Sequence, residues 1–493
     1  MRPAATGPRG PLDALLNVFS DVRPGEGLTA LLMLINVFLL LSSYYLLKTI
    51  REPLVLAAEG GGAEIKSYAS AGIAVLLILL VPLYGAIASR VSRVPLVNGV
   101  TGFFIACLVL FFVWARAVGV PGTPPEGGEA AQAAAAVGAG QLALGVSFFI
   151  WVGIFNLMII AQFWAFANDI YTVQQGKRLF AIIAFGASLG AIAGARAAET
   201  LIERIGLYPL MAIAAVLLFA CMFLTNVVHL REKRRAADRP AAAPEEAGAS
   251  SAKGGDAGAP AAAKPDEKAD PDARISGRNG FSLVFADRYL LVIALLMLTL
   301  NLVNSTGEYI LGETLTNIGQ ARVQQGQLAE ADVGSWIGAF YGNYFFWVNL
   351  VSAVIQGFFV SRVIKLIGVR GSLLVLPFVA LGAYATLALI PLLPIIRGVK
   401  IAENSLDYSL NNTARQTLFL PTSREAKYKG KQAVDTFFVR LGDVVSAGLV
   451  FAGTTWLMLK PQGFALVNVA LVLVWLGLAF WIGRAFQVKS GER

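Results

Sequence analysis

Gly85-Ala-Ile-Ala-Ser89-Arg90-Val91-Ser-Arg93, which continues to Gly99, recurs 272 residues later as Gly357-Phe-Phe-Val-Ser361-Arg362-Val363-Ile-Lys365, which continues to Gly371. Each stretch joins the second long apolar run of a set of six to the third. A weaker echo is Gly176-Lys177 against Gly430-Lys431, at the start of the fifth and eleventh runs. One short match could arise by chance, but two matches at equivalent places indicate two related halves.

The apolar runs identify the class of protein. Of the 493 residues, 56% are hydrophobic and 14% are charged, whereas soluble domains contain about 25% charged residues. A bilayer core of roughly 30 Å requires about 20 apolar residues per helix, and runs of this length recur along the chain. They predict an all-α membrane protein with about twelve transmembrane helices in two six-helix halves. The predicted spans are 28–47, 67–88, 95–115, 142–166, 179–198, 208–229, 289–311, 334–360, 372–391, 394–418, 433–457 and 463–486.

The sequence between and around the halves is polar. Residues 231–280 are rich in Ala, Pro, Gly, Asp, Glu and Lys, and such a segment cannot bury enough apolar surface to order itself. The predicted organisation is a cytoplasmic N-terminal segment (1–27), an N-terminal half (28–229), a flexible cytoplasmic linker (230–288), a C-terminal half (289–486) and a cytoplasmic tail (487–493).

Lysine and arginine are distributed unequally between the two sets of loops. One set contains most of them: Arg90, Arg93, Lys177, Arg178, Arg231 to Arg235, Arg362, Lys365, Arg370, Lys427, Lys429 and Lys431. The opposite set contains few: Lys66, Arg116, Arg204, Arg322 and Lys460. By the positive-inside rule the first set faces the cytoplasm, so we expect a multi-pass protein of the cell (inner) membrane with both termini cytoplasmic. Topology thus explains the net charge of +9, and no nucleic-acid partner is expected.

The parallel repeat of six helices resembles the plan of the major facilitator superfamily, in which the substrate is held between the halves near the bilayer midplane. The Gly85 and Gly357 stretches resemble the loop motif of that superfamily, with Ser89 where an Asp is usual. We expect structural or gating roles at Arg90, Arg93, Asp169, Lys177, Arg178, Arg362, Asp435, Arg440 and Asp443. Arg440 and Asp443 are three residues apart on a helix, so a stabilising pair and a gate are both open.

Three predicted spans contain polar side chains on one helix face. This is informative because an ionisable group in the membrane is costly and usually faces a cavity or a partner. At helical spacing, the tenth span contains Lys400, Asn404, Asp407, Asn411 and Arg415, the seventh contains Asn301, Asn304, Ser305, Glu308 and Gly312, and the first contains Tyr44, Lys48 and Arg51. Two alternatives stay open: the tenth segment is a cytoplasmic loop, or Lys48 and Arg51 only snorkel to the outer interface.

Cations at several depths favour an anionic solute. They are Lys48, Arg51, Lys400, Arg415, Lys429 and Lys431. Because lysine and arginine are the usual protein partners of phosphate, a phosphorylated solute fits. The expected substrate-binding set also contains their polar neighbours Asn304, Glu308, Asn404, Asp407 and Asn411.

Three segments resemble the ATP/ADP translocase family of plastids and intracellular bacteria. The first is Leu47-Lys-Thr-Ile-Arg51-Glu52-Pro-Leu54-Val55, followed by Gly62-Ala63-Glu64. The second runs from Gln162-Phe163-Trp164-Ala165-Phe166-Ala167-Asn168-Asp169 to Gly176-Lys177-Arg178-Leu179-Phe180. The third is Tyr408-Ser409-Leu410, then Lys429-Gly430-Lys431-Gln432-Ala433-Val434-Asp435 and Arg440-Leu441-Gly442. The twelve-span layout fits this family over nearly the whole chain, as expected of a divergent bacterial relative.

The resemblance implies exchange of a nucleotide whose phosphates are held by basic side chains. The family's functional lysine after the first span aligns with Arg51, and its late lysine aligns with Lys429 or Lys431. The family's glutamate in the fourth span is not matched, since that helix has only Asn156. Its glutamate in the seventh span aligns with Asn304, with Glu308 one turn further on.

We therefore expect a secondary transporter that exchanges nucleotides of the ATP/ADP type, or a related phosphorylated anion, by alternating access. Because the chain has no Gly-rich phosphate loop with Lys-Ser/Thr, ATP would be cargo and not fuel. Two alternatives stay open: a proton-coupled carrier of another solute with Asp407 or Glu308 as the proton site, and a non-transporting membrane helper. With one histidine and no metal-ligand spacing, we expect no enzyme, catalytic residue, cofactor or metal. The oligomeric state is left open.

Overall fold

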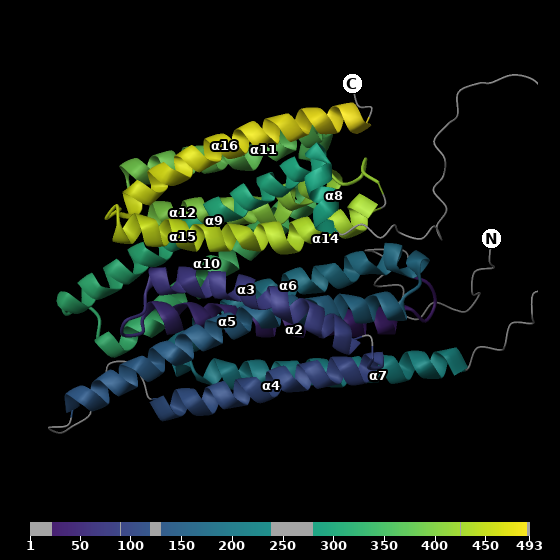
Figure 1. Ribbon diagram of the computed structural model, residues 1–493. Helices are drawn as coiled ribbons and strands as arrows, with labels where there is room; N and C mark the ends of the chain where they lie inside the picture. The colour runs from purple at the N-terminus through teal and green to yellow at the C-terminus, as the bar shows by residue number, and fades with distance from the viewer. Residues whose placement is uncertain (1–21, 89, 119–129, 238–279, 424, 491–493) are drawn as a thin grey trace, which may run out of the picture.

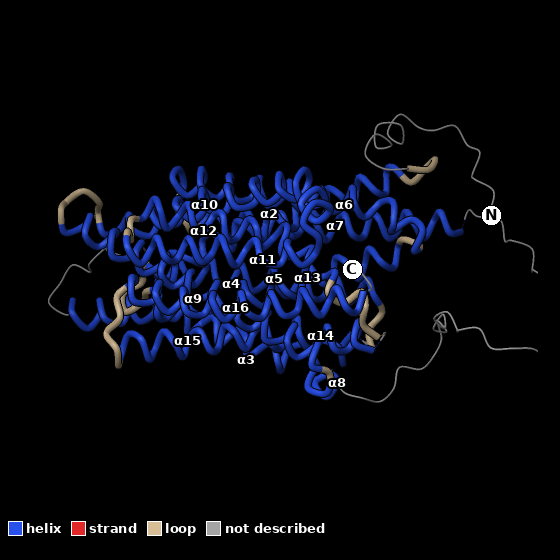
Figure 2. Tube along the Cα trace, turned by 90° about the horizontal axis from the view of Figure 1, so that it is seen from above, coloured by secondary structure: helices blue, strands red, loops and turns tan. Residues whose placement is uncertain are grey.

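The computed structural model describes residues 22–88, 90–118, 130–237, 280–423 and 425–490, and these parts of the chain are helical without a strand. Long helices lie side by side along one direction (Figure 1). The view turned by 90° shows the same bundle (Figure 2). Helices are expected here, because a chain in hydrocarbon must satisfy its backbone hydrogen bonds within each segment.

The N-terminal half consists of six long helices. They are α2 (Gly27–Leu56), α3 (Ala63–Ala88), α4 (Arg93–Val118), α5 (Ala130–Ile170), α6 (Val173–Ile205) and α7 (Pro209–Ala237). The first five each contain a predicted span and extend beyond it, and α7 begins one residue after the predicted start at 208 and continues past 229. The first helix continues nine residues past the predicted end at Leu47 and carries Arg51 and Glu52 into the bundle.

The C-terminal half begins with the short helix α8 (Gly280–Ala286) and continues with six spans. The elements are α9 (Arg288–Gln324), α10 (Val333–Val354) with the π-helical turn Ile355–Phe359, α11 (Val360–Leu389), α12 (Leu393–Leu406) with the π-helical turn Asp407–Asn411, α13 (Asn412–Thr417), α14 (Lys431–Ala433) between the π-helical turns Ala426–Gly430 and Val434–Phe438, α15 (Val439–Thr455) and α16 (Pro461–Ser490). A 3-10 turn, Glu330–Asp332, precedes α10.

Within the described ranges, ten segments are long and apolar enough to cross a membrane. One of them, Glu330–Leu389, covers two predicted spans, which are separated by a sharp break at Gly368 with φ of 70°. The tenth predicted span, now α12 and α13, is absent from these ten because it is polar and interrupted by a π-helical turn. Its helices nevertheless pack against α9, α10 and α11. The interpretation of this segment as a cytoplasmic loop is therefore wrong.

Glycine allows α6 to lie close to α2 within the N-terminal half. Gly186, Gly190 and Gly194 are spaced by four residues, and a Cβ on each would collide with the backbone carbonyl of Leu34, Phe38 or Ser42. Small residues at such spacing let two helices pack in van der Waals contact where lipid offers no hydrophobic driving force.

A second glycine row holds the two halves together at one end. Gly334, Gly338 and Gly342 of α10 face the end of α6 and the residues after it, and a Cβ on Gly342 would lie 2.8 Å from the backbone of Glu199. Polar contacts lie beside this row, since Asn343 donates to Glu199 at 2.8 Å and accepts a hydrogen bond from Arg397 of α12. Glu199 belongs to the N-terminal half, so these contacts join the halves where α2 and α9 end.

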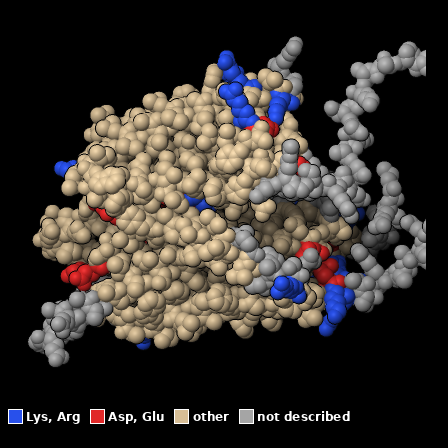
Figure 3. Space-filling model, in the orientation of Figure 1, with Lys and Arg blue, Asp and Glu red and all other residues tan. Residues whose placement is uncertain are grey.

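The molecular surface is arranged as a bilayer requires. Uncharged residues cover its middle, and most of the lysine, arginine, aspartate and glutamate side chains on this face gather toward the two ends (Figure 3). The same view shows a hollow between the halves toward the end where α16 finishes. The bundle is thus closed at the glycine row of α10 and open toward the opposite end.

We predict that Gly342→Val destabilises the bundle by about 1–3 kcal/mol, because the added branches meet backbone that cannot move aside. Thermal unfolding of the purified protein in detergent measures the change. Gly382→Val is the matched control, since a Cβ at Gly382 of α11 meets open space. Equal unfolding temperatures for the two variants would contradict the tight approach of α10 to α6.

Candidate functional site

A cavity lies between the halves, at the level where α2, α3, α9 and α12 face one another. Its lining combines charged, polar and aromatic side chains: Lys48, Arg51, Glu52, Lys66, Ser67, Ser70, Phe149, Asn304, Ser305, Glu308, Tyr309, Phe345, Asn404, Tyr408, Asp443 and Ser446. Five predicted substrate-binding residues are among them, namely Lys48, Arg51, Asn304, Glu308 and Asn404. The polar faces predicted for the first and seventh spans therefore meet here.

The N-terminal half supplies an ion-paired cluster from α2 and α3. Lys66 Nζ lies 2.7 Å from Glu52 Oε2, and Arg51 Nε lies 3.0 Å from Glu52 Oε1. The Arg51 guanidinium also stacks 4.4 Å from the centre of the Phe149 ring. The buried carboxylate of Glu52 thus orients both Arg51 and Lys66 beside the cavity. Its single negative charge neutralises only one of the two positive charges.

The C-terminal half supplies a second cluster, centred on Lys400 of α12. Its ammonium lies 2.9 Å from Glu403 Oε2 and donates to Asn304 Oδ1 at 2.9 Å. Tyr384 also donates to Glu403, at 2.9 Å. Lys400 is fully buried and does not line the cavity. It therefore positions Asn304 and Glu308 from behind, and its predicted contact with substrate is not made from the cavity lining of this structure.

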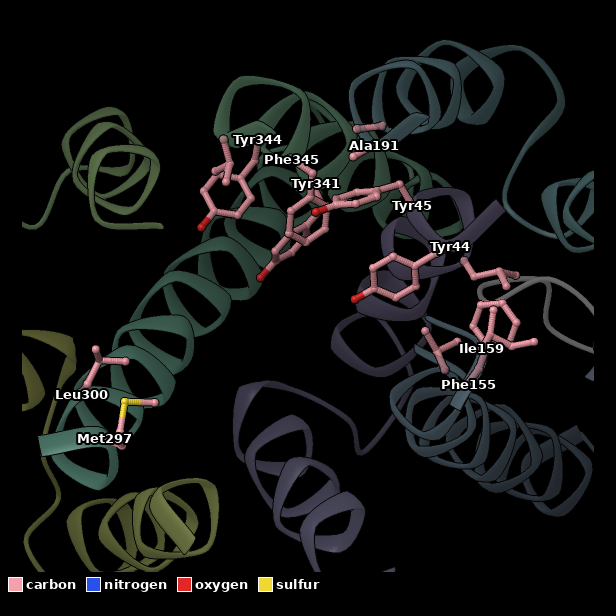
Figure 4. Packing of buried hydrophobic residues seen from close by; sticks show 14 of the residues in the cluster. Tyr44, Tyr45, Phe155, Ile159, Ala191, Met297, Leu300, Tyr341, Tyr344 and Phe345 are labelled. Atoms are coloured by element: carbon pink, nitrogen blue, oxygen red, sulfur yellow. The ribbon is translucent and has the colours of Figure 1, made fainter. Parts of the chain in front are cut away.

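Lys48 is placed differently from these lysines. Aromatic rings surround its ammonium, with the centre of Phe345 at 4.2 Å, Tyr45 at 5.2 Å and Tyr408 at 6.0 Å. In the described parts of the chain no carboxylate oxygen lies within 4 Å of it. Figure 4 shows Tyr45 of α2 beside Tyr341 and Phe345 of α10. Cation–π contacts stabilise a desolvated ammonium only partly, so an anion in the cavity would find an uncompensated positive charge.

Asp443 of α15 completes the C-terminal wall. Asn301 and Ser305 of α9 donate to its Oδ1 at 2.7 and 2.8 Å. Its Oδ2 lies 3.2 Å from Arg440. Arg440 thus compensates the charge of Asp443. The other charged side chains at the cavity are four cations and three carboxylates: Lys48, Arg51, Lys66 and Lys400, and Glu52, Glu308 and Glu403. Among the described residues this is an excess of one positive charge.

The model of the family described as TLC ATP/ADP transporter matches residues 14–229 and 259–489. The chain belongs to this family. The ADP,ATP carrier protein 1 of Chlamydia pneumoniae is 24% identical over 530 residues, which covers 97% of this chain and 95% of that protein. The ADP,ATP carrier protein 1 of Chlamydia trachomatis serovar D is also 24% identical, over 94% of this chain and 89% of that protein.

Solved structures give the fold of this TLC transporter. The nucleoside transporter NupG has a TM-score of 0.55 at 10% identity, and the match covers 94% of this chain and 100% of that one. A bacterial homologue of the iron transporter ferroportin, in an inward-facing state, has a TM-score of 0.55 at 14% identity, with 92% and 98% coverage. These similarities confirm the predicted major-facilitator-like architecture of about twelve helices.

The positions that the family resemblance pointed to in the sequence divide into two groups. Arg51, Asn304 and Glu308 line the cavity. Asn156 of α5 does not, and its Oδ1 is buried without a hydrogen-bond partner in the described residues. Lys431 is away from the cavity and lies 3.8 Å from Asp435, while the side chain of Lys429 is outside the described residues.

The lower part of the predicted stripe on the tenth span turns away from the cavity. Asn411 donates to Asp407 at 2.7 Å, and Arg415 contacts Met297 and Asn412. None of these three predicted site residues lines the cavity. The physical reason is the π-helical turn Asp407–Asn411, since one inserted residue rotates the following face by roughly 100°.

The predicted gating residues lie mostly near the end with the hollow. Arg90 and Asp169 are exposed, and Arg362 donates to the carbonyl of Phe358. Arg178 forms two hydrogen bonds of 3.0 Å with Glu26, just before α2. The side chains of Arg93 and Lys177 are outside the described residues. Of the gating residues whose side chains the structure describes, Asp443 alone lines the cavity.

The Glu26 contact is electrostatically strong. Partial burial raises the pKa of Glu26, but hydrogen bonds from Arg178 and Gln175 outweigh burial, and the pKa lies below the usual value of a glutamate. A carboxylate with a lowered pKa stabilises the fold above its unfolded pKa, and this contribution is lost as the pH falls through the folded pKa. The contact between α2 and α6 is therefore fully present near neutral pH.

Two site residues were missed by the sequence analysis. Lys66 was assigned to an outer loop, but it lies within α3 and is buried, because that helix begins at Ala63 and not at 67. Glu52 appears in the sequence analysis only as part of the first translocase-like segment, without a role. Opposite charges at positions 52 and 66, on either side of a short turn, were the signal that could have paired them.

We predict that Lys400→Met destabilises the protein by about 3–5 kcal/mol, because it leaves Glu403 buried without its ammonium partner. Lys48→Met is the matched control, since it removes a lysine of similar burial that pairs with no described carboxylate. Thermal unfolding in detergent compares the two. An equal loss of stability in both variants would refute the division between a structural lysine and a ligand-facing one.

Proposed function

We propose that this TLC transporter exchanges ADP and ATP across the cell (inner) membrane by alternating access, with both termini in the cytoplasm. The six-helix halves, 28–229 and 289–486, would move against each other around the central cavity, joined by the linker 230–288. A major-facilitator-like fold supports this, because such carriers hold substrate between the halves near the midplane.

The main support for this proposal is the ammonium of Lys48, whose charge no nearby carboxylate of the described residues compensates. A buried cation is costly unless an opposite charge pairs with it, and among the described residues the protein supplies aromatic rings instead. The phosphates of a nucleotide would provide the missing charge. Arg51 and Lys66 lie on the same side of the cavity and can hold further phosphate oxygens, Arg51 in the two-pronged geometry that guanidinium groups favour.

The aromatic lining suits the remainder of a nucleotide. Tyr408 is 41% exposed and lines the cavity next to Lys48, with Phe345 on the other side of that ammonium. Base–aromatic stacking contributes about 1–3 kcal/mol and tolerates any base. The family membership supports adenine nucleotides in particular, because the relatives named above are ADP,ATP carriers.

Proteoliposomes loaded with ADP are predicted to take up labelled ATP, and empty liposomes are predicted to take up little. Lys48→Met should raise the KM for ATP by about tenfold or more, since the loss of a charge-assisted contact costs about 1.5–3 kcal/mol. Lys460→Gln, a change at an exposed lysine, is the control and should leave KM unchanged. Absence of nucleotide uptake into ADP-loaded liposomes would overturn the proposed function.

A further inference from the structure

One ion pair joins the two halves in the described parts of the chain. Lys66 of α3 lies 3.7 Å from Glu308 of α9. Lys66 also donates to the hydroxyl of Tyr341 on α10 at 3.3 Å. The ammonium therefore belongs to the N-terminal half by sequence, but it contacts the C-terminal half at two points.

Glu308 is held less tightly than the other two glutamates of the cavity region. Glu52 and Glu403 each contact a lysine directly, at 2.7 and 2.9 Å, and their side chains are 2% and 4% exposed. Glu308 lies 3.7 Å from Lys66 and 3.6 Å from Lys400, beyond hydrogen-bond range, and is 23% exposed. Its direct hydrogen bonds come from the neutral donors Tyr344 and Asn404, each at 3.2 Å.

This geometry makes the Lys66–Glu308 pair the one that an incoming anion can replace. An anion in the cavity reaches Lys66 from the same side as Glu308 does, because both residues line it. Glu52 also lines the cavity, but its side chain is almost fully buried and lies 2.7 Å from Lys66, so it is harder to displace than Glu308. If Glu308 is displaced from Lys66, it still has Lys400, Tyr344 and Asn404 within its own half.

We propose that Glu308 is an internal counter-anion that couples transport to exchange. In the empty carrier it occupies Lys66 and links the halves; a phosphate of the substrate takes its place at Lys66 and releases the link. The inference rests on the proposed function, since it assigns a role within nucleotide exchange. Glu308 acts through Lys66 and is thus a positioning residue.

The coupling follows from the energy of separating charges in a region of low dielectric. Rearrangement of the empty carrier must pull Lys66 from Glu308, which leaves Lys66 sharing Glu52 with Arg51 and leaves Glu308 sharing Lys400 with Glu403. The loss of this pair is unfavourable because neither charge gains a new partner. When a phosphate is bound to Lys66, the Lys66–Glu308 pair is already broken. The same movement then separates no ion pair between the halves. A ligand shifts a conformational equilibrium only by its differential affinity for the states, and here the differential arises from the exchanged ion pair. Only the loaded carrier then rearranges readily.

Glu308→Gln tests this proposal, because glutamine keeps the size of the side chain and an oxygen that accepts from Tyr344 or Asn404, but has no charge. Proteoliposomes loaded with labelled ADP are placed in buffer with or without external ATP. We expect release without external nucleotide to rise roughly tenfold, as for a typical coupling free energy, so that the stimulation of release by external ATP falls by the same factor. A merely structural role would lower both rates together.

Two further variants make the test decisive. Glu232→Gln removes a carboxylate whose ion pair with Arg235 lies within one half, and should keep uncoupled release at the wild-type rate. Lys66→Gln breaks the same link from the other side and should also raise uncoupled release, but with a higher KM for nucleotide because the phosphate contact is lost. If Glu308→Gln does not fold, as judged by thermal unfolding, Lys66→Gln alone decides.

The outcomes separate this inference from the function on which it rests. If the wild-type protein exchanges nucleotides and folded Glu308→Gln shows no increase in uncoupled release, the inference is overturned. Loss of both kinds of release in the folded variant overturns it as well. If the wild-type protein itself fails to exchange nucleotides, the proposed function fails, and the coupling role fails with it.

Discussion

Removing a cation from water requires an opposite charge nearby, and this requirement organises the space between the two halves. Glu52 contacts Lys66 and Arg51 on one side, Glu403 contacts Lys400 on the other, and Glu308 lies between Lys66 and Lys400. Lys48 has only aromatic rings around it in the described structure. This deficit of one negative charge is the basis of the proposal that the cavity binds the phosphates of a nucleotide.

The cavity depends on how closely the helices approach at its closed end. Glycines of α10 lie against α6, and the chain of contacts from Glu199 through Asn343 to Arg397 crosses the halves beside them. At this end a bulky side chain would separate the halves. Toward the other end the surface is hollowed between them (Figure 3). A bundle that is closed at one end and hollowed at the other is the arrangement that alternating access requires of one of its two states.

Much of this arrangement could be predicted from the sequence, because hydrophobic runs and polar helix faces are local signals. Asn304 and Glu308 lie on the cavity as the spacing of the seventh span predicts, and Lys48 and Arg51 do so on the first. The errors come from features that are not local. The π-helical turn after Leu406 rotates Asp407, Asn411 and Arg415 away, and no spacing rule for a regular helix anticipates it. The role of Lys400 depends on Glu403 and Tyr384, and that of Lys66 on a helix starting four residues earlier than expected.

The central claim is that the phosphates of a nucleotide supply the charge missing at Lys48. Ligand-induced thermal stabilisation of the purified protein tests it most directly, because a ligand that binds the folded state raises the unfolding temperature by mass action. We expect ATP and ADP to stabilise the wild-type protein more than AMP does, and adenosine to have little effect. In the Lys48→Met variant, the difference in stabilisation between ATP and adenosine should largely disappear. Equal stabilisation by adenosine and ATP, or an undiminished ATP effect in Lys48→Met, would contradict it.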